Sequence, residues 1–130
     1  MDLTSNMKNQ IVMKMSPQEF FCTGTWPSEE SWNQYLSNHY SNHTRFLMKD
    51  KDFLSYEETS ECLMIKDFIA STRNAYQFVV EMIDKSFLLG KPIRGWMHIS
   101  NFGLINAALK RFDFKIIGFA NGQVLIERSV

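Results

Sequence analysis

The stretch ISNFGLINAALKRFDFKIIGF, from Ile99 to Phe119, carries dense local structural signals. Ser100 or Asn101 can cap a helix near its start, because either side chain can accept a hydrogen bond from a first-turn amide. Apolar residues then recur at helical spacing and predict one buried helix face, made by Leu104, Ile105, Ala108, Leu109 and Phe112. The run DFKIIGFA follows as a strand. The stretch therefore predicts a strand end, a capped helix and a second strand in close succession.

The segments on either side of this stretch give equally local signals. Asn121-Gly122 predicts a hairpin between the last two strands, DFKIIGFA and QVLIERS. Upstream, an apolar stripe predicts a helix from Thr72 to Leu89 that stops at Gly90, and IRGWMHI follows as a strand. Three short extended stretches, TRFLMK, DFLSYE and ECLMIKDFIA, precede this helix and predict a meander of strands.

The N-terminal part of the chain adds a strand and two helices. Residues 1–9 are polar and predict a flexible tail, so a single domain should span residues 10–130. QIVMKM is a strand candidate, and Ser16 begins a helix with Pro and Glu in favourable positions. Ser28 can cap a second helix that ends near His39. The predicted order is β-α-α-β-β-β-α-β-α-β-β, an α/β (α+β) arrangement.

Composition argues against several classes of partner and location. The chain has 14 basic and 14 acidic residues, so no net charge attracts it to nucleic acid or anionic lipid. Its apolar runs are far shorter than the roughly 20 residues of a membrane-spanning helix, and the start MDLTSNMKNQ lacks a signal-peptide pattern. Cys22 and Cys62 lack CxxC spacing, and Cys62 in ECLMI is typical of a reduced core thiol. These features predict a cytoplasmic protein.

The predicted element order resembles the fold of the GCN5-related N-acetyltransferases over nearly the whole chain. IVMKMSPQEF resembles the family's first strand and helix, and the strand from Glu61 to Ala70 resembles its fourth strand. The Asn before the last helix and the Gly-Phe pair in the next strand also match. The ending is further similar to that of short phage proteins of this fold, including an internal virion protein. The resemblance implies a central mixed sheet of about seven strands flanked by helices.

In this family, acetyl-coenzyme A lies where the fourth and fifth strands separate, and its pyrophosphate lies at the start of the helix that follows the fourth strand. The resemblance places Arg73 at the first position of the family's phosphate-binding loop, but Tyr76 and Phe78 at its two glycine positions. Rings at these positions could remove two charge-assisted hydrogen bonds and weaken binding about 100-fold or more. The implied cofactor-binding residues are Ser71, Thr72, Arg73, Asn74 and Asn101.

The family's proton-transfer groups are harder to place on this chain. The position of its general-acid tyrosine falls on Leu109 or Ala108, and neither side chain can donate a proton. His98 is the strongest candidate for a general base, because strand alternation places it with Arg94 and Trp96, opposite Met97 and Ile99. Glu61 and Asp67 are the carboxylate alternatives. A lone histidine at a strand end is also commonly a hydrogen-bonded structural residue, and both interpretations remain open.

Two functional hypotheses follow from these patterns. The first is a catalytically degenerate homologue that acts through protein contacts, in a phage particle or on a host target. The second is an active N-acetyltransferase that uses acetyl-coenzyme A. Abundant Phe and Met side chains favour a protein partner. His39 and His43 have the spacing of a metal pair, but they lack further ligands, so we expect no metal.

Overall fold

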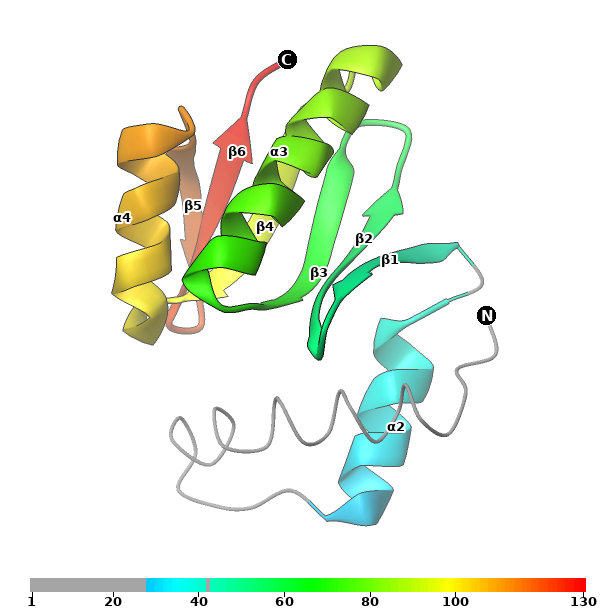
Figure 1. Cartoon of the computed structure of the whole chain (residues 1–130). Coiled ribbons are helices and arrows are strands. Elements are labelled where there is room, and N and C mark those ends of the chain that lie inside the picture. The colour runs from blue at the N-terminus through cyan, green and yellow to red at the C-terminus, as the bar shows by residue number, and fades with distance from the viewer. Residues whose placement is uncertain (1–27, 42) are drawn as a thin grey trace.

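The computed structural model describes residues 28–41 and 43–130, and Figure 1 shows their arrangement. The strand expected at residues 10–15, the helix expected to begin at Ser16, and Cys22 lie outside the described residues. The described elements follow the expected order: α2 (Glu29–His39), β1 (Thr44–Lys49), β2 (Asp52–Glu58), β3 (Leu63–Ile69), α3 (Thr72–Leu89), β4 (Ile93–His98), the 3-10 turn η1 (Ile99–Asn101), α4 (Phe102–Arg111), β5 (Lys115–Ala120) and β6 (Gln123–Arg128).

The strands form one mixed sheet in the order β1-β2-β3-β4-β6-β5. The β3–β4 pair is parallel, and the other neighbouring pairs are antiparallel. The α3 helix connects the two parallel strands, as a parallel connection requires. The described part of the sheet has six strands rather than the expected seven, and the remaining expected strand, at residues 10–15, lies outside the described residues.

Local sequence signals account for most element boundaries. The Ser28 hydroxyl accepts a hydrogen bond from the Ser31 amide at 3.1 Å and caps α2. Gly90 ends α3 with a left-handed φ of 65°, a conformation in which glycine avoids steric strain. Asn121 and Gly122 both have positive φ and close the β5–β6 hairpin, as the dipeptide predicts.

The boundary after β4 differs from the expected one. Ile99 was assigned to the strand, but the strand ends at His98 and Ile99 begins η1. The imidazole of His98 accepts a hydrogen bond from the Ser100 amide and so caps this turn. A side-chain cap of this kind is not typical of histidine, and the apolar character of Ile99 favoured a strand.

Helices pack on both faces of the sheet, and Figure 1 shows α3 and α4 together on one of them. The α3 and α4 helices pack on one face, where Phe78, Met82, Ile105 and Ala108 join sheet residues such as Leu54 in the main core cluster. A second cluster forms around Phe53, with Leu36 and Tyr40 from the α2 segment. Phe53 and Leu54 are neighbours on β2, so strand alternation sends them to opposite faces. Cys62 is buried with a free thiol, as expected.

Within residues 28–41 and 43–130, none of the helices combines the length and apolar character that crossing a lipid bilayer requires.

Candidate functional site

The parallel strands β3 and β4 pair over only part of their length. Leu63, Met64 and Ile65 lie in register with Ile93, Arg94 and Gly95. Beyond these positions, β3 continues to Ile69 and β4 continues to His98 without further pairing between them. The carboxyl ends of the two central strands therefore separate, and ligands of open α/β sheets commonly bind at such a place.

A β-bulge explains where this separation begins. Ser55 lies opposite Asp67 while Tyr56 lies opposite Ile65, which leaves Lys66 as an extra residue on β3. A bulge bends the strand that carries it and re-aims its side chains. Pairing with β4 stops at Ile65, directly before the bulge. At that last paired position, a Cβ on Gly95 would lie 3.3 Å from the Cβ of Ile65, so glycine permits the close approach there.

The first turn of α3 lies just beyond the separated end of β3. Its first intrahelical backbone bond runs from the Ala75 amide to the Ser71 carbonyl at 2.8 Å. The backbone amides of Thr72 and Arg73 have no acceptor among the described residues. Both side chains are exposed. These amides and the helix dipole together favour an anion at this position.

The two rings expected to block this turn lie farther along the helix. Phe78 is 3 % exposed and belongs to the main core, with its ring centroid 6.4 Å from that of Phe68. Tyr76 is 61 % exposed, and its ring centroid lies 5.6 Å from that of Phe112. Phe78 therefore points into the protein interior and does not cover the amides of Thr72 and Arg73.

A resident carboxylate opposes anion binding at the same helix end. Asp52, on β2, is buried, and its Oδ2 accepts hydrogen bonds from the Ser71 amide and from Asn74 Nδ2, both at 2.9 Å. Asp50 Oδ2 also accepts from Asn74 Nδ2, at 3.3 Å. Ser71 and Asn74, both candidate cofactor residues, thus hold a carboxylate of the protein itself, while Thr72 and Arg73 remain available.

His98 lies at the separated end of β4, but its hydrogen bonds fix its role. Its Nδ1 accepts from the Ser100 amide at 3.1 Å and lies 2.7 Å from the Ser100 hydroxyl. An amide can only donate, so the proton of the neutral imidazole resides on Nε2. His98 can therefore donate a hydrogen bond from Nε2 but cannot accept a proton there. Asn101 occupies the cap position of α4 without a side-chain capping bond.

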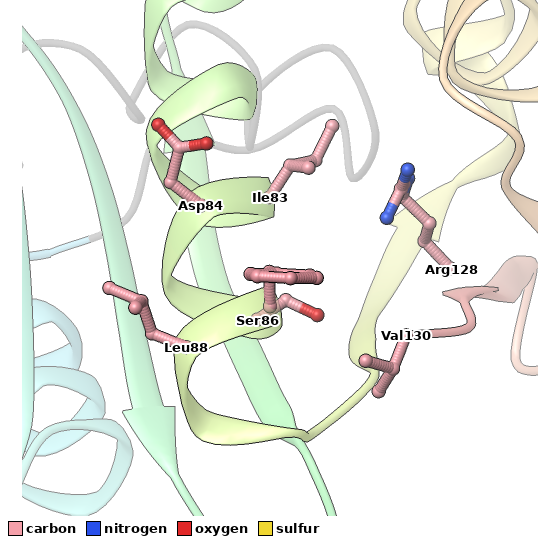
Figure 2. A pocket seen from close by; sticks show the side chains of 7 residues that line it. Ile83, Asp84, Ser86, Leu88, Arg128 and Val130 are labelled. Atoms are coloured by element: carbon pink, nitrogen blue, oxygen red, sulfur yellow. The ribbon is translucent and has the colours of Figure 1, made fainter.

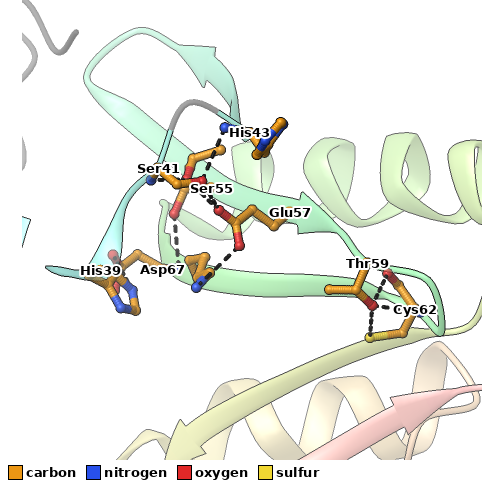
Figure 3. Close-up of polar contacts among 10 residues, drawn as sticks. His39, Ser41, His43, Ser55, Glu57, Thr59, Cys62 and Asp67 are labelled. Carbon is orange, nitrogen blue, oxygen red and sulfur yellow. Dashed lines mark hydrogen bonds and ion pairs between the residues drawn. The ribbon is translucent and has the colours of Figure 1, made fainter. Parts of the chain in front are cut away.

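Asp67 is surrounded by donors from the α2 segment. The hydroxyl of Tyr35 lies 3.1 Å from Asp67 Oδ1, the hydroxyl of Tyr40 bonds to Oδ2, and His39 Nε2 lies 3.3 Å from Oδ2 without hydrogen-bond geometry. The Asp67 amide also donates to Ser55 Oγ at 3.0 Å (Figure 3). The Asp67 side chain is only 10 % exposed. The carboxylate therefore holds α2 against the sheet.

The remaining proton-transfer candidates lie away from the separated strands or lack the chemistry. Glu61 precedes β3, at the end where the strands are still paired, and its carboxylate is 3.5 Å from Arg94 Nη1. Ala108 is buried, and Leu109 packs against the core. The family's general-acid position therefore carries no side chain that can protonate a leaving group.

Burial and the charge of Asp67 raise the pKa of the Tyr40 hydroxyl far above its ordinary value of 10.0. Above pH 10 the unfolded chain loses this proton while the folded protein retains it, so stability falls as pH rises. The expected slope is about 1.4 kcal/mol per pH unit. Tyr40→Phe should remove this contribution, which urea unfolding between about pH 9 and 11 can measure. The exposed-ring variant Tyr76→Phe should keep the full slope, and an unchanged slope in Tyr40→Phe would contradict the assignment.

A cavity lies at the opposite end of α3 from the available amides. It encloses about 610 Å³ between the C-terminal half of α3 and the end of the chain, where Ser86, Leu88, Arg128 and Val130 contribute to its walls (Figure 2). It therefore does not belong to the separated strands. Among residues 28–41 and 43–130, no group of three or more His, Cys, Asp or Glu side chains is placed to hold a metal ion.

Two solved structures resemble the fold over almost the entire chain. One is PH1933 from Pyrococcus horikoshii OT3, with a TM-score of 0.72 and 15% identity over 100% of this chain and 94% of that one. The other is an acyl-CoA N-acyltransferase from Pseudomonas aeruginosa, with a TM-score of 0.61 and 12% identity over 98% and 94% of the two chains. The protein therefore shares its fold with these two proteins.

Comparisons of sequence add no relative. No family model matches the chain, and no curated protein matches it. The expected likeness to phage proteins finds no support in the similar structures.

Proposed function

We propose that the protein binds acyl-coenzyme A where β3 and β4 separate, and that it transfers the acyl group slowly because its proton-transfer groups are absent or occupied. The observation that carries this proposal is the coincidence of three features at one place. These are the end of β3–β4 pairing, the bulge at Lys66 and the available amides of α3. We choose acyl-coenzyme A as the ligand because one of the proteins with a similar fold is an acyl-CoA N-acyltransferase.

The residues present fit the phosphate portion of this ligand. The amides of Thr72 and Arg73 and the Arg73 guanidinium supply donors to an anion, and each charge-assisted hydrogen bond contributes about 1.5–3 kcal/mol. The buried Asp52 carboxylate reduces the positive potential at this helix end and lowers the affinity. The buried position of Phe78 removes the main steric objection.

The same site is poorly equipped for catalysis. Bound acyl-coenzyme A supplies an activated acyl group, and an efficient enzyme adds a base for the attacking amine and an acid for the departing thiolate. Here His98 carries its proton on Nε2 in the neutral state, and Asp67 is enclosed by two tyrosine hydroxyls. Neither Ala108 nor Leu109 can act as the acid. Positioning of the two reactants remains the contribution that the fold can make.

Acetyl-coenzyme A is expected to raise the melting temperature. At 100 times its dissociation constant it adds about 2.7 kcal/mol of stability, which corresponds to about 10 °C for a domain of this size. Arg73→Glu should reduce this shift by more than half, because it reverses a charge beside the available amides. Lys115→Glu, an equal change of charge on β5, should leave the shift intact. No shift in wild type at millimolar ligand would overturn the proposal.

Thiol release from acetyl-coenzyme A, measured with an added primary amine, separates binding from catalysis. We expect a melting shift with thiol release close to the rate without protein. Fast release would overturn the slow-transfer part of the proposal and favour an active N-acetyltransferase, while binding would stand.

A role in protein contacts is a second candidate function. On β5, Ile116, Ile117 and Phe119 are 39 %, 48 % and 76 % exposed, and β5 forms one edge of the described sheet. Exposed apolar side chains on a sheet edge are typical of surfaces that pair with another chain. This surface is separate from the ligand site, so both functions could coexist in one molecule.

A further inference from the structure

A second cavity lies between the β1–β2 hairpin and the C-terminal half of α3. It is open to solvent on one side and has a volume of about 510 Å³, which lies in the range of small-molecule sites. Its polar lining includes Arg45 from β1, Tyr56 and Glu58 from β2, Lys85 from α3, and Lys91 from the loop before β4. Lys85 and Thr72 are separated by about 20 Å along α3. The cavity is therefore distinct from the proposed acyl-coenzyme A site.

The lining carries positive charge that no acidic side chain of the described residues neutralises. Glu58 is the acidic residue of the lining, and it is already paired with Lys91, whose Nζ also donates to the Thr59 carbonyl at 2.8 Å. Arg45 and Lys85 have no acidic partner among the described residues. Two unpaired cations thus face one cavity in a protein of zero formal charge, which creates a local attraction for anions.

Tyr56 adds a hydrogen-bond donor to the wall of the cavity. The residue is 8 % exposed and packs in the main core, yet it also lines the cavity. No described residue forms a hydrogen bond with its hydroxyl, and this oxygen is not among the buried unpaired atoms of the described residues, so it is open to the cavity. A ligand oxygen in the cavity could therefore accept a hydrogen bond from it.

We infer that this cavity binds a phosphate monoester of a small molecule. The Arg45 guanidinium suits phosphate because its planar fork can donate two parallel hydrogen bonds, and Lys85 adds a second positive charge. Tyr56 donates from the buried side of the cavity. The end of α3 carries partial negative charge, which opposes an anion, so the two cations are both required.

The test is a titration with inorganic phosphate at constant ionic strength. Binding is detected by NMR of the uniformly ¹⁵N-labelled protein. We expect saturable shifts centred on Tyr56 and Lys85. Arg45→Gln should weaken binding by about tenfold or more, and Tyr56→Phe by about 3- to 10-fold. Tyr56→Phe retains the buried ring and removes only a hydroxyl that bonds to none of the described residues, so folding should be preserved.

The matched control is Lys115→Gln, which removes an exposed cation elsewhere and should leave phosphate binding unchanged. Arg45→Gln should also leave the melting shift with acetyl-coenzyme A unchanged, so the two sites are tested separately. Shifts that do not saturate, or equal weakening in Lys115→Gln, would overturn the site. Acetate that binds as tightly as phosphate would overturn the assignment to phosphate.

Discussion

Phe78→Ala should lower the free energy of unfolding by about 3–5 kcal/mol and should not tighten acetyl-coenzyme A binding. The side chain is 3 % exposed and packs in the main core beneath α3, so its removal leaves a cavity. The amides of Thr72 and Arg73 are not shielded by this ring, so their access to a ligand does not improve. Urea unfolding gives the stability change, and calorimetric titration of acetyl-coenzyme A gives the affinity.

Tyr76→Ala provides the comparison on the same helix. Because its ring is 61 % exposed, we expect a stability change within about 1 kcal/mol. If the two rings instead close the site, both variants would bind acetyl-coenzyme A more tightly than wild type. That result would show that the glycine positions of the family loop are occupied by blocking side chains.

Elements with strong local signals could be predicted from the sequence. The α3 boundaries, the left-handed Gly90 and the Asn121-Gly122 turn match because each depends on residues within one or two turns of chain. The alternation along β4 was also correct, since Met97 packs toward the core while Arg94 pairs with Glu127. The spacing of apolar residues and the presence of Gly or Asn at turns are sufficient to predict such features.

Features that join distant segments could not be predicted. The bulge at Lys66 depends on the register between β2 and β3, and no local signal in ECLMIKDFIA marks it. Asp52, on β2, contacts the start of α3 from a distant part of the chain, by accepting hydrogen bonds from the Ser71 amide and from Asn74 Nδ2. Its effect on the helix end is electrostatic and becomes visible only after the hairpin has been placed beside α3.

The candidate base residues show the same limit. The sequence placed His98 at the end of the correct strand, but the Ser100 amide decides which imidazole nitrogen carries the proton. Asp67 was identified as a carboxylate on β3, while its donors Tyr35 and Tyr40 come from a segment more than 25 positions away. Sequence patterns locate such groups, and three-dimensional contacts determine what they can do.

Asp67→Ala should lower the free energy of unfolding by about 2–4 kcal/mol, because it removes the buried carboxylate to which the Tyr35 and Tyr40 hydroxyls donate. Both hydroxyls bond to this carboxylate, and Tyr40 is only 7 % exposed. Asp84→Ala on the exposed face of α3 is the matched control and should change stability by less than about 0.5 kcal/mol. Urea unfolding measures both variants.

Amide hydrogen exchange shows which part of the protein loses stability in Asp67→Ala. It therefore distinguishes a role of Asp67 in holding α2 from a general loss of stability. Because Asp67 connects β3 to the α2 segment, amide hydrogen exchange in Asp67→Ala should accelerate in α2 well before it does in α3. Asp67→Asn keeps an acceptor oxygen and should restore part of the protection. Equal acceleration in α2 and α3, or wild-type stability in Asp67→Ala, would show that α2 is held by the Phe53 cluster alone and that the carboxylate remains available for another role.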